Sequence, residues 1–162
     1  MAQKTSKRKF KSKTVKVRGY YTIFMFFILI LLDRVTKIWA SSRNISKDYG
    51  IMAFTYTNNT GAGFSILQNM NFLLIIISIV VLGAVIYFHK QIPRFSLITI
   101  VAGIFGNLVD RIFYGSVIDF INFKFWPIFN IADSLIFVGA IYWAIQIIKE
   151  ERKLKTNSKV DR

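Results

Sequence analysis

The sequence contains no cysteine, one histidine (His89) and only eight acidic residues among its 162 residues. A chain without cysteine forms no disulfide, has no thiol nucleophile and cannot build a cysteine-based zinc site. Against the eight acids stand 22 Lys and Arg, which give a net charge of +14. Such an excess suggests nucleic-acid binding when it is spread over a polar surface. Here it is concentrated at the ends of apolar segments, so we expect no nucleic-acid partner.

Apolar residues dominate the rest of the chain. They make up 54% of the sequence, and 16% of all residues are aromatic, which is far too apolar for an ordinary soluble domain. A membrane-spanning helix needs roughly 20 mostly apolar residues. Four stretches can be drawn to about that length, namely Tyr20–Ala40, Phe72–Phe88, Phe95–Tyr114 and Ile131–Ile148. We therefore predict an all-α membrane protein with four transmembrane helices.

Basic residues at the flanks of these segments predict the topology, because cytoplasmic segments near a membrane hold the excess of Lys and Arg. Eight occur in residues 1–19, two in the loop HKQIPR, and six in the tail 149–162. Both termini are therefore expected in the cytoplasm, with a four-helix domain over 20–148 whose outer loops span 41–71 and 115–130. His89 then lies on the cytoplasmic side, which excludes a Ser-His-Asp triad on the outer side.

The basic N-terminal segment also has the outline of a secretory signal, since it precedes the apolar run Tyr20–Leu32. Against cleavage, LDRVTK follows this run at once, and no convincing A-x-A site is present. We interpret the segment as a topology anchor that contacts anionic membrane lipid.

Four aspartates lie in or beside the membrane segments: Asp33, Asp110, Asp119 and Asp133. At 1.5 Å per residue, Asp33 lies about 20 Å along the first segment and Asp110 about 22 Å along the third. Asp133 opens the fourth segment and Asp119 lies just before it, so all four reach the outer interface. Charges at this depth are costly unless they pair or face water, and four together indicate a site.

Local spacing suggests roles for the polar residues of the helices. Asn107, Asp110 and Arg111 share one helical face, and the preceding AGIFG supplies small residues for close helix packing. This pattern predicts a buried polar brace. Asp33 and Lys37 are i and i+4, typical of a simple intrahelical pair, so we expect Asp33 to be supportive rather than catalytic.

Asp119 and Asp133 are expected in different environments. VIDFINF is a strand-like run in which Val117, Asp119, Ile121 and Phe123 share a face, and desolvation there favours the protonated acid. Asn130 is a plausible N-cap that places Asp133 at position N3, where the helix dipole favours the ionised form. Two carboxylates in opposite protonation states are what general acid and general base catalysis needs. They could share one proton and activate a water against an amide.

Four motifs occur in this order along the chain: NNTGAGFSIL (58–67), GNLVDRI (106–112), VIDFI (117–121) and FNIADS (129–134). Together with LDRVTK, they are similar to the signature blocks of bacterial prolipoprotein signal peptidase, or signal peptidase II. The resemblance implies a membrane aspartyl endopeptidase that cuts diacylglyceryl-modified prolipoproteins just before the lipidated cysteine. We expect the enzyme to act near the extracytoplasmic face of the cell membrane, as a monomer and without metal or cofactor.

The resemblance also assigns the site residues. The catalytic pair falls on Asp119 and Asp133. The substrate-binding and supporting set is Asn59, Gly61, Asn107, Asp110, Arg111, Asn130 and Asp33. Gly63 stands where the family usually has alanine, and the 13 residues between the two acids are fewer than usual. A small β-rich cover on the extracytoplasmic side is expected from the outer loops, mainly 51–67, with NNTG as a turn between two strand-prone runs.

Two other classes remain as alternatives at this level. A small ion- or proton-coupled transporter could use intramembrane aspartates, but its acids should lie near the midplane. A membrane scaffold could use polar residues to join helices, but this gives no reason for VIDF and NIADS to lie outside the helix contacts.

Overall fold

The computed structural model describes residues 2–62 and 66–160, with side chains for residues 19–62, 66–153 and 155–156. Gly63 lies outside the described residues. Within them the chain forms four helices: α1 (Ala2–Ser42), α2 (Asn71–Tyr87), α3 (Arg94–Tyr114) and α4 (Ile131–Val160). Each predicted apolar segment matches one helix to within a residue or lies inside it. α1 and α4 continue into the polar flanks, where Lys, Arg, Glu and Gln are good helix formers.

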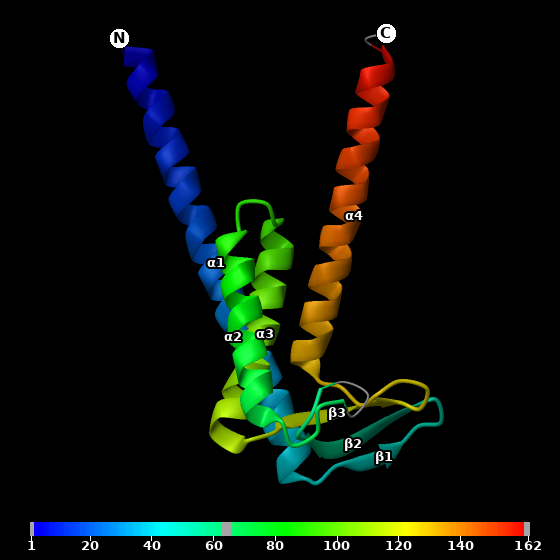
Figure 1. Ribbon diagram of the computed structural model, residues 1–162. Coiled ribbons are helices and arrows are strands. Elements are labelled where there is room, and N and C mark those ends of the chain that lie inside the picture. The colour runs from blue at the N-terminus through cyan, green and yellow to red at the C-terminus, as the bar shows by residue number, and fades with distance from the viewer. Residues whose placement is uncertain (1, 63–65, 161–162) are drawn as a thin grey trace.

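The helices form a bundle with both termini at one end (Figure 1). The short turn between α2 and α3 lies at this same end, and a small sheet lies at the opposite end. α3 is the central helix and packs against α1, α2 and α4. α1 and α4 diverge toward the termini.

Small residues allow α3 and α4 to approach closely. A Cβ atom on Gly103 would lie 2.3 Å from the carbonyl oxygen of Ala132, and one on Gly139 would lie 2.3 Å from Oγ1 of Thr99. Backbone groups therefore meet where larger residues would hold the helices apart. The expectation for AGIFG is confirmed at Gly103.

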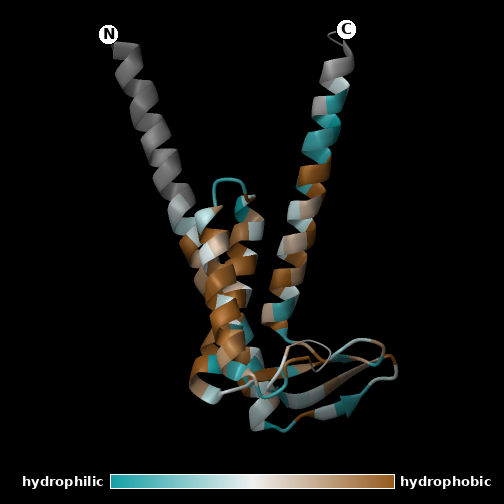
Figure 2. Cartoon of the chain, in the orientation of Figure 1, coloured by the Kyte–Doolittle hydropathy of each residue, from teal (hydrophilic) through white to brown (hydrophobic). Residues whose placement is uncertain are grey.

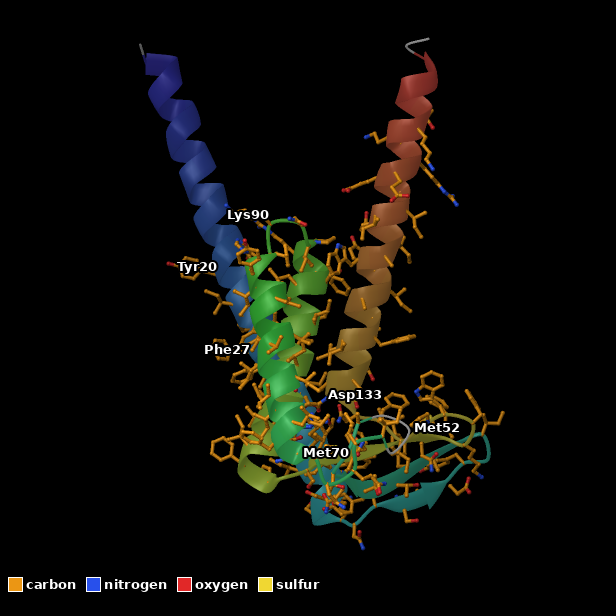
Figure 3. The ribbon with its side chains drawn as sticks, viewed as in Figure 1. Tyr20, Phe27, Met52, Met70, Lys90 and Asp133 are labelled. Atoms are coloured by element: carbon orange, nitrogen blue, oxygen red, sulfur yellow. The ribbon has the colours of Figure 1, made fainter. Side chains whose placement is uncertain are left out.

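The helices of the bundle consist mainly of hydrophobic residues (Figure 2). Phe27, Phe72 and Phe113 are 62%, 76% and 75% exposed, and Phe27 points outward from α1 (Figure 3). α3 and residues 131–153 of α4 are long and apolar enough to cross a membrane, while α2 is a shorter apolar helix. The exposed apolar side chains are those that a lipid environment accommodates.

Three antiparallel strands form the sheet in the order β1 (Ser46–Asp48), β2 (Met52–Asn59), β3 (Val117–Phe123). Asn59 pairs with Val117 and Thr57 with Asp119. Gly115, with φ of 71°, ends α3 in the left-handed conformation and lets the chain turn directly into β3. The strand predicted from VIDFINF is confirmed.

The strand-prone run before NNTG forms β2 and the chain bends at Thr60 and Gly61, but the bend begins later than predicted because Asn58 and Asn59 belong to β2. β2 pairs with β1 and β3, and Ile66 and Leu67 lie in a turn rather than a strand. The physical reason is local: the backbone N–H of Gly61 donates to Oδ1 of Asn59 at 2.9 Å, which turns the chain away from the sheet. β1 and β2 form a hairpin around Gly50, whose φ is 88°.

The sheet is fastened to the end of α1 by a small core. Ala40, Ile45 and Phe120 are buried together, with partly buried neighbours around them. Trp39 adds edge-to-face contacts with Phe54 and Phe120. Because Phe120 follows Asp119 directly, this packing also fixes where the Asp119 carboxylate lies relative to the helices.

Candidate active site

Asp119 lies on β3, 2% exposed, with both carboxylate oxygens hydrogen-bonded. Asn59 Nδ2 donates to Oδ2 at 2.8 Å and Asn130 Nδ2 donates to Oδ1 at 2.7 Å. Burial raises the pKa of Asp119 from its ordinary 3.8 to about 7, and the nearby charge of Asp133 acts in the same direction. The two asparagine hydrogen bonds lower this pKa, but their effect is smaller. The expectation of an acid that favours protonation agrees with this environment.

Asp133 lies in the first turn of α4, at the end of the helix that faces the sheet (Figure 3). Its backbone N–H donates to Oδ1 of Asn130 at 2.9 Å, while the backbone N–H of Asn130 donates to its Oδ2 at 3.2 Å. This reciprocal arrangement has the form of a capping box. Asn130 as N-cap and Asp133 at N3 are both confirmed.

Asn130 connects the two acids. Its side chain is fully buried, its Oδ1 accepts from the Asp133 backbone, and its Nδ2 points to Asp119 Oδ1. The same Nδ2 lies 3.1 Å from Oδ1 of Asn107 and 3.3 Å from the carbonyl oxygen of Ile118. One amide therefore fixes the start of α4 against β3 and α3.

Asn107 on α3 supports Asp133 from the other side. Its Nδ2 donates to Asp133 Oδ1 at 2.7 Å, and its Oδ1 accepts from Lys37 Nζ at 3.0 Å. Asp133 thus receives a hydrogen bond on each carboxylate oxygen, one from Asn107 and one from the Asn130 backbone.

A buried ion cluster lies behind these residues, between α1 and α3. Lys37 Nζ is 2.8 Å from both Asp33 Oδ2 and Asp110 Oδ2, and Arg34 Nη2 is 2.5 Å from Asp110 Oδ1. Asp33, Lys37 and Asp110 are at most 1% exposed. Two acids and two bases balance in charge, as burial requires.

Asp33 has a second contact that joins α1 to α4. Its Oδ1 accepts from the backbone N–H of Ala132 at 2.8 Å, one residue before Asp133. The predicted Asp33–Lys37 pair is confirmed, but a simple intrahelical pair was too narrow an interpretation for Lys37. Arg34 was not among the predicted site residues, although an intramembrane cation beside Asp33 has to pair with some acid.

Arg111 and Gly61 lie at the other edge of the site. Arg111 Nη2 donates to the carbonyl oxygen of Gly61 at 3.2 Å. A Cβ atom on Gly61 would lie 2.6 Å from the carbonyl oxygen of Ile66, so the loop closes on itself only with glycine there. Asn71 at the start of α2, also missed, donates to the carbonyl oxygen of Arg111 at 3.0 Å.

A cleft of about 190 Å³ opens where these groups meet. Its polar lining comes from β2, α3, β3 and α4: Asn59, Asn107, Arg111, Asp119 and Asp133. The predicted Asp33 and Asp110 lie behind this lining. The segment Trp126–Ile128 borders both this cleft and a polar cavity of about 560 Å³. Trp126, Phe129 and Asp133 also border an apolar cavity of about 630 Å³ that extends along α4 to Phe137.

The side chains present in the cleft limit its chemistry. Within residues 2–62 and 66–160, no group of three or more His, Cys, Asp and Glu side chains could hold a metal ion. His89 follows α2, on the turn at the far end of the bundle from Asp133. The arrangement offers two carboxylates, amide donors and a guanidinium around a space that admits water.

The fold and the cleft define a membrane enzyme, and solved structures support this class. Two bacterial membrane enzyme structures determined by the in meso method are similar to the chain. One has a TM-score of 0.73 at 28% identity and covers 81% of this chain and 89% of its own. The other has a TM-score of 0.69 at 29% identity and covers 80% and 93%.

The chain belongs to the signal peptidase II family of aspartic-type peptidases, because the family model described as Signal peptidase (SPase) II matches residues 25–149. A lipoprotein signal peptidase of Clostridium novyi is 40% identical over 137 residues, 75% of this chain and 93% of that protein. Those of Clostridium tetani and Syntrophomonas wolfei are 39% and 34% identical and cover 80% and 82% of this chain. The resemblance noted from the motifs is confirmed. Because the chain belongs to a family of hydrolases, the two alternative functions considered from the sequence, a transporter and a membrane scaffold, are not supported.

Proposed function

We propose that this chain removes the signal peptide from prolipoproteins that carry a diacylglyceryl-modified cysteine, cutting just before that cysteine. Asp119 and Asp133 are the catalytic pair in this proposal. The observation that carries it is Asn130, a buried amide that contacts both acids and holds them at one cleft. A structural role for the acids alone gives no reason to direct both toward the same space.

The two acids divide the chemistry. Asp119, protonated, donates a hydrogen bond to the carbonyl oxygen of the scissile amide, while ionised Asp133 takes a proton from water. The resulting hydroxide attacks the carbonyl carbon and forms a tetrahedral intermediate. The proton held by Asp133 then passes to the leaving amine, the C–N bond breaks, and the pair returns to sharing one proton.

Neighbouring groups support this mechanism. Arg111, always charged and rigid, lines the cleft and holds the loop at Gly61. Asn59 holds Asp119 Oδ2. The apolar cavity beside Asp133, lined by Phe129, Phe137 and Val138 among others, offers a surface suited to acyl chains. Site and lipid-binding surface are then adjacent, as a lipid-modified substrate needs.

The proposed topology has four membrane spans, with the termini and the loop at 89–94 in the cytoplasm. The basic flanks favour this orientation, and it places the sheet and the cleft at the extracytoplasmic face. The division into a basic segment (1–19), a membrane peptidase domain (20–148) and a charged tail (149–162) follows from it. One chain supplies both acids, so we expect a monomer surrounded by membrane lipid.

Cleavage by the purified protein in micelles tests this proposal. The substrate is a prolipoprotein with its diacylglyceryl group, and the matched control is the same chain without the lipid. We expect cleavage of the lipidated form alone, with product masses that place the cut directly before the modified cysteine. Equal cleavage of both forms, or a cut elsewhere, would contradict the proposed substrate.

A further inference from the structure

Lys37 makes one contact that charge balance does not explain. Its ammonium is fully buried and lies 2.8 Å from a carboxylate oxygen of Asp33 and of Asp110. With Arg34 on Asp110, the cluster is already neutral. The third contact, 3.0 Å to Oδ1 of Asn107, is to an uncharged amide. A buried ammonium has three N–H donors, so its third N–H needs an acceptor, and the Asn107 amide oxygen supplies one without adding a charge. The same contact constrains the Asn107 amide.

The Lys37 contact, together with Asn130 Nδ2 at 3.1 Å from the same oxygen, determines which way the Asn107 amide faces. An ammonium can only donate hydrogen bonds, so the amide oxygen must face Lys37 and the amide NH2 must face away from it. In this orientation Nδ2 donates to Asp133 Oδ1 at 2.7 Å. A flipped amide would place NH2 against the ammonium and against Asn130 Nδ2, and its oxygen against a carboxylate.

We propose that Lys37 is a positioning residue, which orients the Asn107 amide and through it holds Asp133 for catalysis. This inference rests on the proposed catalytic pair. Lys37 does not line the cleft, and Asn107 lies between it and Asp133. Loss of Lys37 therefore affects the chemical step rather than substrate binding.

The test is steady-state cleavage of the lipidated prolipoprotein by Lys37→Met, which keeps the side-chain length and removes the donors. We expect kcat to fall about 100-fold, the scale of a small misplacement of a reacting group, with KM within about threefold of wild type. Arg34→Met is the matched control, because it also leaves the two acids of the cluster with one cation but does not remove a contact of Asn107. It should keep kcat within about threefold.

A double-mutant cycle separates positioning from general damage. If Lys37 acts through Asn107, adding Lys37→Met to Asn107→Ala should lower kcat no further. Multiplied losses in the double variant, or a folded Lys37→Met with kcat near wild type, would overturn the proposal. Loss of KM and kcat together in Lys37→Met and Arg34→Met alike would also overturn it.

Lys37→Met leaves two buried acids with one cation and for this reason can fail to fold. A second variant in which the cluster stays neutral keeps the test valid in that case. Lys37→Met/Asp33→Asn retains the Arg34–Asp110 pair and an oxygen for the Ala132 N–H. The same kcat loss is expected in it, and failure of both variants to fold would make Lys37 purely structural. Asp133→Asn in the same assay tests the proposed function separately, since full activity there would remove the catalytic pair itself.

Discussion

Asparagine side chains connect the two acids of the cleft because an amide both donates and accepts. Asn130 uses its oxygen on the backbone of Asp133 and its NH2 on Asp119, while Asn107 donates to the Asp133 carboxylate. Aspartate at either position would bring a third negative charge to the site. The amides thus hold two carboxylates together without adding to their repulsion.

The environment of Asp119 gives a pH-dependent stability with a defined sign. Its pKa is about 7 in the folded protein against 3.8 as an ordinary group. Between these values the folded state binds more protons than the unfolded state, so this group's contribution to stability falls as pH rises. Asp119→Asn removes the titration. We expect its thermal midpoint, relative to wild type, to rise between pH 4 and pH 8 in detergent micelles. A difference that is constant or decreases over this range would contradict the assigned cause.

Substitutions of Arg111 test whether the shape of its side chain matters at the edge of the cleft. Its guanidinium donates to the Gly61 carbonyl and faces the space beside both acids. Lysine keeps the charge but loses the rigid fork of donors, so Arg111→Lys should process substrate about 10-fold more slowly, on the scale of one lost charged hydrogen bond. Arg111→Ala should be slower still. Wild-type rates for both variants would reduce Arg111 to a topological charge.

At the scale of elements, the sequence predicted what local patterns control. The apolar runs predicted all four helices, VIDFINF predicted β3, and FNIAD predicted the cap that places Asp133. The pairing of the strands could not be predicted from the sequence, because β1 is a short polar strand of three residues with no strand pattern. Its pairing with β2 is stabilised by tertiary contacts that propensity does not report.

The site residues also divide into those that local sequence patterns predicted and those that only tertiary contacts reveal. The helical period placed Asn107, Asp110 and Arg111 on one face, and the motifs brought Asp119 and Asp133 together. The contacts of Lys37 and Arg34 with Asp110 run between α1 and α3, across more than 70 residues of sequence. Spacing within one helix could not reveal them.

The α3–α4 crossing gives a prediction at the element scale. Gly103→Ala places a Cβ atom against the backbone of Ala132, which directly precedes Asp133. We expect a loss of about 1–3 kcal/mol in stability, typical of overpacking, together with slower cleavage because the start of α4 must move. Gly83 on α2 is the matched control, since a Cβ there meets nothing within 4 Å.

Gly83→Ala should be neutral or stabilise the protein by up to about 1 kcal/mol, because alanine is the better helix former. Thermal unfolding in micelles and the cleavage rate are measured for both variants. Equal behaviour of the two glycine variants would contradict the close α3–α4 packing as a determinant of the site.

At the scale of the whole molecule, orientation in the membrane decides whether the site can meet exported substrates. Reporter tags active only in the cytoplasm should give signal at both termini and in the 89–94 turn. A tag beside Asp48, on the sheet at the other end of the bundle, should report the outside. Cytoplasmic signal at Asp48 would place the cleft on the wrong face for prolipoprotein processing.

The shared proton of Asp119 and Asp133 is the central claim, and cleavage by their asparagine variants measures it most directly. If the acids act as one unit, each is useless without the other and their losses are strongly non-additive. Asparagine keeps the volume and part of the hydrogen bonding. Asp48→Asn is the matched control, because Asp48 is exposed, lies outside the cleft lining, and contacts Lys124 Nζ at 2.7 Å and the Gly50 backbone N–H at 2.8 Å.

We expect Asp119→Asn and Asp133→Asn each to abolish cleavage of the lipidated prolipoprotein while the protein still inserts and folds. The double variant should be no worse than either single, and Asp48→Asn should match wild type. Wild-type turnover should follow a bell-shaped pH profile whose two limbs belong to the pair. Substantial cleavage by either folded single variant would contradict the account.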